Sequence, residues 1–81
     1  MRFRREWLIA LRTERGWSQG DLQRVLFEKA KVWVTRTAIA MWEKGEVVAP
    51  RGHYVAALAK VFGVTMESFF SANGTAETKE Q

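Results

Sequence analysis

Cysteine is absent from this sequence of 81 residues, and histidine occurs once, as His53. Without cysteine the chain has no disulfide bonds and no thiolate metal ligands, which suits the reducing cytoplasm, where we expect the protein to reside. A single histidine with no ligand motif around it predicts no metal site. The sequence also has no glycine-rich phosphate loop and no motif that pairs His53 with a nucleophile. It therefore predicts a protein that is not an enzyme and needs no cofactor.

Long hydrophobic runs are missing as well. The apolar stretch at residues 7–11 is too short for the core of a signal peptide, and Arg12 follows it directly. No stretch has the length of a membrane-spanning helix, so we expect no membrane partner. Apolar residues nevertheless make up 47% of the chain and include four Trp and five Phe, enough for one core. We predict one folded domain over residues 1–70 and a disordered polar tail over residues 71–81.

The net charge of +4 is unevenly distributed along the chain. Residues 1–65 contain 12 Lys and Arg against 6 Asp and Glu, whereas residues 66–81 contain one Lys against three Glu. A basic domain attracts polyanions, among which nucleic acid is the commonest. A solvated surface rich in lysine and arginine is the alternative explanation.

Apolar residues recur at helical spacing in five short segments, and no segment alternates as a strand would. Ser18, with Asp21 three residues later, and Thr35 are typical helix N-caps. Gly16 and Gly45 are typical of helix C-terminal ends. The pattern predicts an all-α fold. In chain order, the helices are expected at about residues 3–15, from 19 to an unpunctuated end near residue 30, at 36–44, at 52–62 before Gly63, and in a short turn after Thr65.

The third predicted helix has two unlike sides. On a helical wheel Ile39 and Trp42 fall together with Thr35, which places the larger apolar side chains on one side. The opposite side is small, polar or flexible, and it consists of Thr37, Ala40, Met41 and Lys44. A helix that buries one side in its own domain and presses the other into a DNA major groove has this arrangement. An ordinary amphipathic surface helix would have it too.

Three sequence segments occur together in an order that resembles a known family. They are LRTERGWSQGDL at 11–22, VTRTAIAMWEKG at 34–45, and Pro50 followed by YVAALAKVFGVTMESFF at 54–70. Together they resemble the Cro/C1-type helix-turn-helix regulators, also called the Xre family. The resemblance implies a compact five-helix, lambda-repressor-like domain that binds double-stranded DNA. It further implies a transcriptional repressor that reads an inverted repeat as a homodimer.

The resemblance also implies which residues contact DNA. Arg36 would read guanine in bidentate fashion, while Thr37 and Met41 would reach base edges or thymine methyl groups, with Ala40 lining the same side. Gln19 would bind a phosphate and brace the third helix. Further phosphate contacts are implied for Lys44, for the backbone at Gly45 and for Arg51. Arg12 and Glu43 match a structural ion pair of the family, and Trp42 is expected in the core.

Two departures from the family pattern concern the segments around the third helix. About six extra residues lie within 27–33 without a glycine, so either the second helix is longer by more than a turn or the loop is larger. The loop at 46–49 has few basic residues, which predicts weaker phosphate anchoring there. Arg2, Arg4 and Arg5 would supply the missing charge, a hypothesis that charge reversal and the salt dependence of binding would test.

A protein-interaction module or an antitoxin-type partner is the main alternative function. It would use an exposed apolar patch, which we expect from Val47, Val48, Trp33, Phe69 and Phe70. In the family such a patch often serves homodimerisation. Trp33 itself either covers the edge of the core or lies exposed in the enlarged turn, where it would touch a partner.

Overall fold

All regular structure in the computed structural model of the protein, which describes residues 2–46 and 49–70, is helical. The elements are α1 (Arg5–Glu14), α2 (Gln19–Ala30), α3 (Arg36–Lys44), α4 (Gly52–Phe62) and the 3-10 helix η1 (Met66–Phe69). No strand occurs in these two described ranges. The all-α, five-helix prediction is thus confirmed, with a 3-10 turn as its last helix. The predicted tail at residues 71–81 lies outside the described residues.

The helix boundaries follow the local chemistry of the sequence. Ser18 and Asp21 form a reciprocal capping box, in which the Ser18 Oγ accepts from the Asp21 N–H at 3.0 Å and the Asp21 carboxylate accepts from the Ser18 N–H at 2.9 Å. The Thr35 hydroxyl accepts from the N–H of Ala38 at 3.0 Å. Thr35 itself is exposed, because its side chain caps α3 instead of joining Ile39 in the core.

The first helix begins at Arg5, two residues later than predicted. Phe3 has the spacing of a helical core residue and is buried, but it precedes the helix. Its ring stacks on Phe69 at a centroid distance of 5.6 Å and meets Phe70 edge-on at 5.9 Å. This contact with the far end of the domain, together with the Arg4 N–H bonded to the Phe69 carbonyl, holds Phe3 out of the helix.

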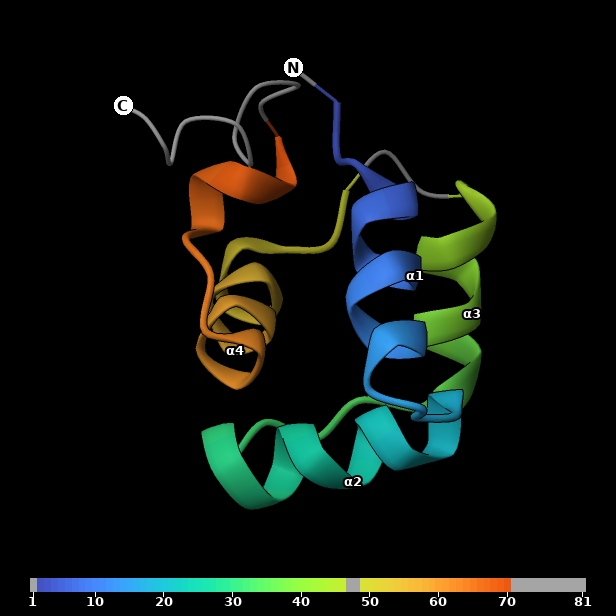
Figure 1. Ribbon diagram of the computed structural model, residues 1–81, viewed down its shortest axis with the longest axis vertical. Helices are drawn as coiled ribbons and strands as arrows, with labels where there is room; N and C mark the ends of the chain where they lie inside the picture. Colours follow the sequence, from blue (N-terminus) through green and yellow to red (C-terminus); the bar gives the residue numbers. More distant parts are fainter. Residues whose placement is uncertain (1, 47–48, 71–81) are drawn as a thin grey trace.

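The helices enclose one core. Helices α1 and α3 run side by side, α2 lies across one end of the pair, and η1 lies near the start of α1 (Figure 1). Helix α2 packs on both α3 and α4, so it joins the two halves of the domain. The side chains with almost no exposed surface come from every element: Leu8, Leu22, Leu26, Ile39, Val55, Leu58 and Phe69. Burial of these apolar groups is what holds α3 in place at the surface.

Candidate nucleic-acid interface

Helix α3 is anchored from behind by its apolar side. Ile39 is fully buried and Trp42 is nearly so, and the Trp42 ring packs on Tyr54 of α4 at a centroid distance of 5.4 Å. Trp42 is therefore part of the core, as predicted from the sequence. These two side chains fix the rotation of α3 about its axis, because turning the helix would expose both of them to water.

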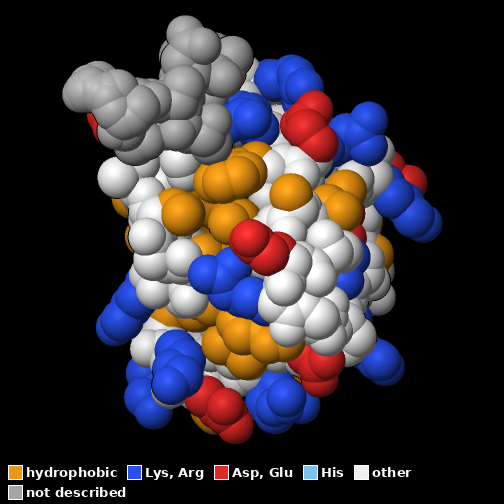
Figure 2. Space-filling view, viewed as in Figure 1, with side chains coloured by type: hydrophobic (Ala, Val, Ile, Leu, Met, Phe, Trp, Pro, Cys, Tyr) orange, Lys and Arg blue, Asp and Glu red, His pale blue; other side chains and the backbone are white. Residues whose placement is uncertain are grey.

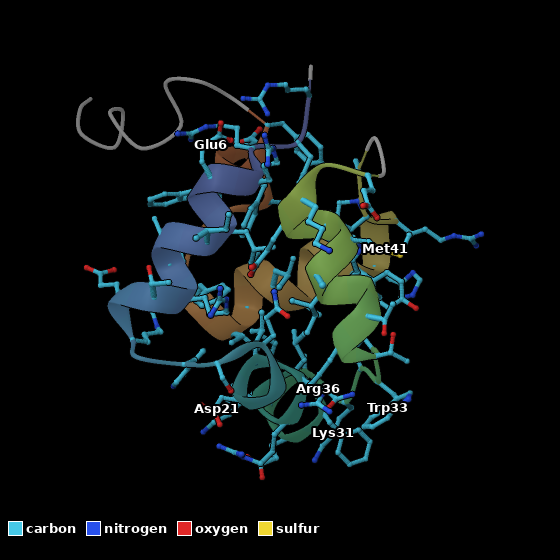
Figure 3. The ribbon with its side chains drawn as sticks, turned by 90° about the vertical axis from the view of Figure 1, so that its right-hand side faces the viewer. Glu6, Asp21, Lys31, Trp33, Arg36 and Met41 are labelled. Atoms are coloured by element: carbon cyan, nitrogen blue, oxygen red, sulfur yellow. The ribbon has the colours of Figure 1, made fainter. Side chains whose placement is uncertain are left out.

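The opposite side of α3 faces solvent. Arg36, Thr37, Met41 and Lys44 are exposed, while Ala40 is half-buried between them. Figure 3 looks onto this side and shows Arg36 near the start of the helix and Met41 farther along it. The described protein leaves this side uncovered, which is what insertion into a DNA groove requires.

Glu43 ties three elements together at the inner edge of α3. Its carboxylate accepts two hydrogen bonds from Arg12 of α1, at 2.7 Å from Nε and at 3.0 Å from Nη2. The Gln19 Nε2 at the start of α2 donates to Glu43 Oε1 at 3.0 Å. The structure thus brings the predicted Arg12–Glu43 pair together and adds Gln19 to it. The bracing that the resemblance implies for Gln19 is this contact.

The position of Gln19 allows for a second contact. Its side chain is half-buried, and only one of its two amide hydrogens is needed for Glu43. The remaining amide hydrogen and the carbonyl oxygen are chemically suited to a phosphate ester. Phosphate binding by Gln19 stays a prediction.

Arg5 reaches the end of α3 from the start of α1, a contact that the sequence reasoning missed. Its Nη1 donates to the Glu43 carbonyl at 3.1 Å, and its side chain covers the Cα of Gly45. Gly45 ends α3 in the left-handed conformation with φ of 79°, so a side chain there would be strained as well as crowded by Arg5. The cation also complements the partial negative charge at the C-terminal end of α3.

The other two N-terminal arginines bind groups of the same chain. Arg2 pairs with Glu6 at 2.7 Å, and this ion pair lowers the pKa of the Glu6 carboxyl. The Arg4 Nη1 donates to the carbonyl of Ser68 at 3.1 Å. Of the three arginines, Arg5 is the one that lies at the end of α3, against Gly45. The hypothesis of additional phosphate contacts from the N-terminal segment requires a positive charge at this place. That hypothesis remains a prediction.

The remaining predicted phosphate contact, Arg51, lies at the N-cap position of α4 and is exposed. Two residues of the preceding loop, Val47 and Val48, lie outside the described residues. On the face drawn in Figure 2, Lys and Arg side chains stand mainly around the rim of the molecule, and apolar side chains lie nearer its centre.

The extra residues before α3 mainly lengthen α2. This helix continues to Ala30 and ends at Lys31, which adopts a left-handed conformation with φ of 59°. The loop that follows is fixed by Val34, which is buried and whose carbonyl accepts from Gln23 Nε2 at 2.9 Å. Residues 31–34 form a loop without regular structure. Of the two alternatives for the insertion, the longer helix is the correct one.

The apolar patch expected from the sequence does not form as predicted. Phe69 is fully buried and Phe70 is half-buried, because η1 folds back so that both rings pack on Phe3. Val47 and Val48 lie outside the described residues. Trp33 is exposed, and its neighbour in space is Phe27 on α2.

Gly20 on α2 makes room for the Arg36 side chain. A Cβ at Gly20 would lie 3.2 Å from the Arg36 Cδ and 3.7 Å from its Nη1, so the arginine stem rests on the bare helix backbone. The sequence reasoning did not single out this residue. The signal was available, because glycine near the start of a helix costs stability relative to alanine and often marks a close approach.

Two further features of the described residues concern other classes of site. No helix in the described ranges has the length and apolarity needed to cross a membrane. Within the same ranges, His and the acidic residues form no group of three or more that is suited to a metal ion.

The chain matches a family model over residues 8–69, and the description of that model is Helix-turn-helix. The protein is thus a helix-turn-helix domain in which α2 and α3 are the paired helices. More particularly, it belongs to the Cro/C1-type (Xre) helix-turn-helix family of regulators that bind double-stranded DNA. Comparison with curated proteins and comparison with solved structures each found no match.

Proposed function

We propose that this protein is a transcriptional repressor that binds an inverted repeat in duplex DNA as a homodimer, with α3 as its reading helix. The observation that carries the proposal is the two-sided placement of α3. Ile39 and Trp42 hold it to the core, while Arg36, Thr37 and Met41 are exposed on one side. A rigid helix with a free row of hydrogen-bonding and apolar side chains meets the demands of base recognition in the major groove.

In this proposal the exposed residues have separate tasks. Arg36 reads guanine through two parallel hydrogen bonds, and Thr37, Ala40 and Met41 contact neighbouring base edges or thymine methyl groups. Phosphates are held by Gln19 at the start of α2, by Lys44 at the end of α3 and by Arg51 at the N-cap of α4. A homodimer would place two copies of α3 about 34 Å apart, one turn of B-DNA.

Selection of bound sites from random duplex DNA tests the proposal. We expect a near-palindromic site and an affinity that falls steeply with added salt. The oligomeric state follows from sedimentation of the free protein and of its complex. If the selection yields no preferred sequence and the affinity does not change with salt, the proposal is wrong.

Substitutions divide the base contacts from the phosphate contacts. Arg36→Ala should lower discrimination at one base pair by about 1–3 kcal/mol, whereas Lys44→Ala should weaken binding to all sequences alike. Lys60→Ala is the matched control, because Lys60 is also an exposed lysine in the last turn of its helix but lies on α4. Unchanged base preference and affinity in Arg36→Ala would show that the reading side is assigned wrongly.

A further inference from the structure

Two aromatic side chains at the junction of α2 and α3 are exposed and contact each other. Phe27 is 53% exposed and Trp33 is 63% exposed. Their rings meet edge to face, with 6.2 Å between centroids and an interplanar angle of 86°. This geometry is the favoured one for an aromatic pair, so Phe27 restricts where the indole of Trp33 can lie. A pair of large aromatic groups held together in water is unusual and indicates a contact surface.

Lys31, between the two aromatic residues in sequence, is in a backbone conformation that favours glycine. It is the non-glycine residue with a positive φ among the described residues. Lysine at such a helix end is less stable than glycine would be, because its Cβ crowds the backbone in the left-handed region. A side chain that weakens its own turn is a candidate for a role outside the fold.

These residues lie beside the start of α3. Figure 3 shows Lys31, Trp33 and Arg36 gathered at that end of the helix, on the side that carries Met41, while Glu6 lies at the opposite end of the molecule. The exposed turn therefore carries an indole and a lysine, and the exposed Arg36 follows at the start of α3. A surface that combines lysine, arginine and an indole N–H complements a phosphate backbone better than it complements an apolar protein partner.

We propose that the turn at residues 31–33 is an additional DNA-backbone contact, placed outside the bases that α3 reads. The Nε1–H of Trp33 donates to a phosphate oxygen, and its ring lies against the adjoining deoxyribose. The ammonium of Lys31 pairs with a neighbouring phosphate, and Phe27 orients the indole. This inference rests on the proposed function, since α3 must enter the groove for the turn to reach the groove wall.

Three variants of the full chain test this contact against the selected duplex. Trp33→Phe keeps the ring but removes the N–H, and Trp33→Ala removes both. We expect affinity to fall about 10-fold in Trp33→Ala and by a smaller factor in Trp33→Phe, equally on selected and unselected sequences. Met66→Ala is the control, because it truncates an exposed apolar side chain on η1, far from α3 along the fold, and should bind as the wild type does.

Lys31→Gly separates a binding role from a structural one. It should raise the melting temperature of the free protein by a few degrees, because it removes the crowded left-handed lysine. It should nevertheless lower the slope of log affinity against log salt concentration by about 0.9 for each protomer bound. A variant that is more stable but binds DNA less well cannot owe its weaker binding to damage of the fold.

The outcomes distinguish this proposal from the function on which it rests. If the wild type binds duplex DNA with a steep salt dependence while Trp33→Ala and Lys31→Gly match it in affinity and slope, the additional contact is overturned and the proposed function stands. If Trp33→Ala changes a sedimenting dimer into a monomer, the aromatic pair joins two copies of the chain, which also overturns the contact. A wild type without salt-dependent binding would remove both proposals.

Discussion

Arg12 and Glu43 form a two-point ion pair between α1 and α3, with 2.7 Å from Nε to Oε2 and 3.0 Å from Nη2 to Oε1. Their side chains are only 14% and 7% exposed. In such surroundings each charge depends on the other, because water cannot solvate the one that is left. The pair therefore holds α3, and with it the exposed side proposed to read DNA, at a fixed position on the domain.

We expect Glu43→Gln to lower the free energy of unfolding by about 3 kcal/mol, because it leaves the Arg12 guanidinium largely buried without a counter-charge. Urea-induced unfolding measures the loss. Glu6→Gln is the matched control, since Glu6 also forms an ion pair of 2.7 Å with an arginine, but both side chains of that pair are exposed. This substitution should cost no more than about 0.5 kcal/mol of stability. Equal small losses in the two variants would contradict the importance given to burial.

The hydrogen bond from Gln19 to Glu43 predicts losses of different size for two substitutions at Gln19. Gln19→Glu places a second carboxylate beside that of Glu43, so both stability and DNA affinity should fall. Gln19→Ala only removes the hydrogen bond and should cost about 1 kcal/mol of stability. Thermal unfolding and binding to the selected duplex measure both. A Gln19→Glu variant as stable as Gln19→Ala would mean that the two carboxylates do not meet.

The contact between Gly20 and Arg36 predicts that stability and DNA binding can be separated. Gly20→Ala should raise the free energy of unfolding by up to about 1 kcal/mol, because alanine favours the helix. The new Cβ would displace the Arg36 stem, so affinity for the selected duplex should fall severalfold. Gly52→Ala serves as the control, since a Cβ at this first residue of α4 meets no atom. Unaltered DNA affinity in Gly20→Ala would argue against a base contact by Arg36 in its present orientation.

The capping box predicts a dependence of stability on pH. Hydrogen bonds from the backbone N–H and side chain of Ser18 lower the pKa of the Asp21 carboxyl in the folded state. A folded-state pKa below the unfolded value stabilises the fold above the unfolded pKa, and this contribution is lost as the pH falls through the folded one. Melting temperatures recorded from pH 7 downward should therefore fall less steeply below about pH 4 in Asp21→Asn than in the wild type. Parallel curves would contradict the assigned role.

The helix boundaries were predictable because they depend on local chemistry. The side chains of Ser18 and Thr35 bond to backbone groups three residues away, and Gly45 has the freedom that a left-handed helix end requires. Such features can be identified from the sequence without knowledge of the fold. The end of α2 was placed near residue 30 from the apolar spacing alone, because Lys31 occupies the left-handed position where a glycine would have marked the helix end.

Features that depend on distant parts of the chain escaped the sequence reasoning. Phe3 continues the apolar spacing of the first helix, yet its contact with Phe69 removes it from that helix. The same contact buries Phe69, which the sequence allowed on an exposed patch. The hydrogen bond from Arg5 to the Glu43 carbonyl likewise exists only because the start of α1 meets the end of α3. Neither pairing has a signal in residue type or spacing.

Two hydrogen bonds from Arg4 join the two ends of the described chain. The Arg4 amide donates to the Phe69 carbonyl, and the Arg4 Nη1 donates to the Ser68 carbonyl, 64 residues away. Such a closure becomes favourable only after the intervening helices have brought its ends together, so it forms late in folding. It also removes the freedom that lets most terminal segments fray. Hydrogen exchange at the Arg4 amide should consequently proceed at the rate of whole-domain opening, which makes this one proton a reporter of global stability.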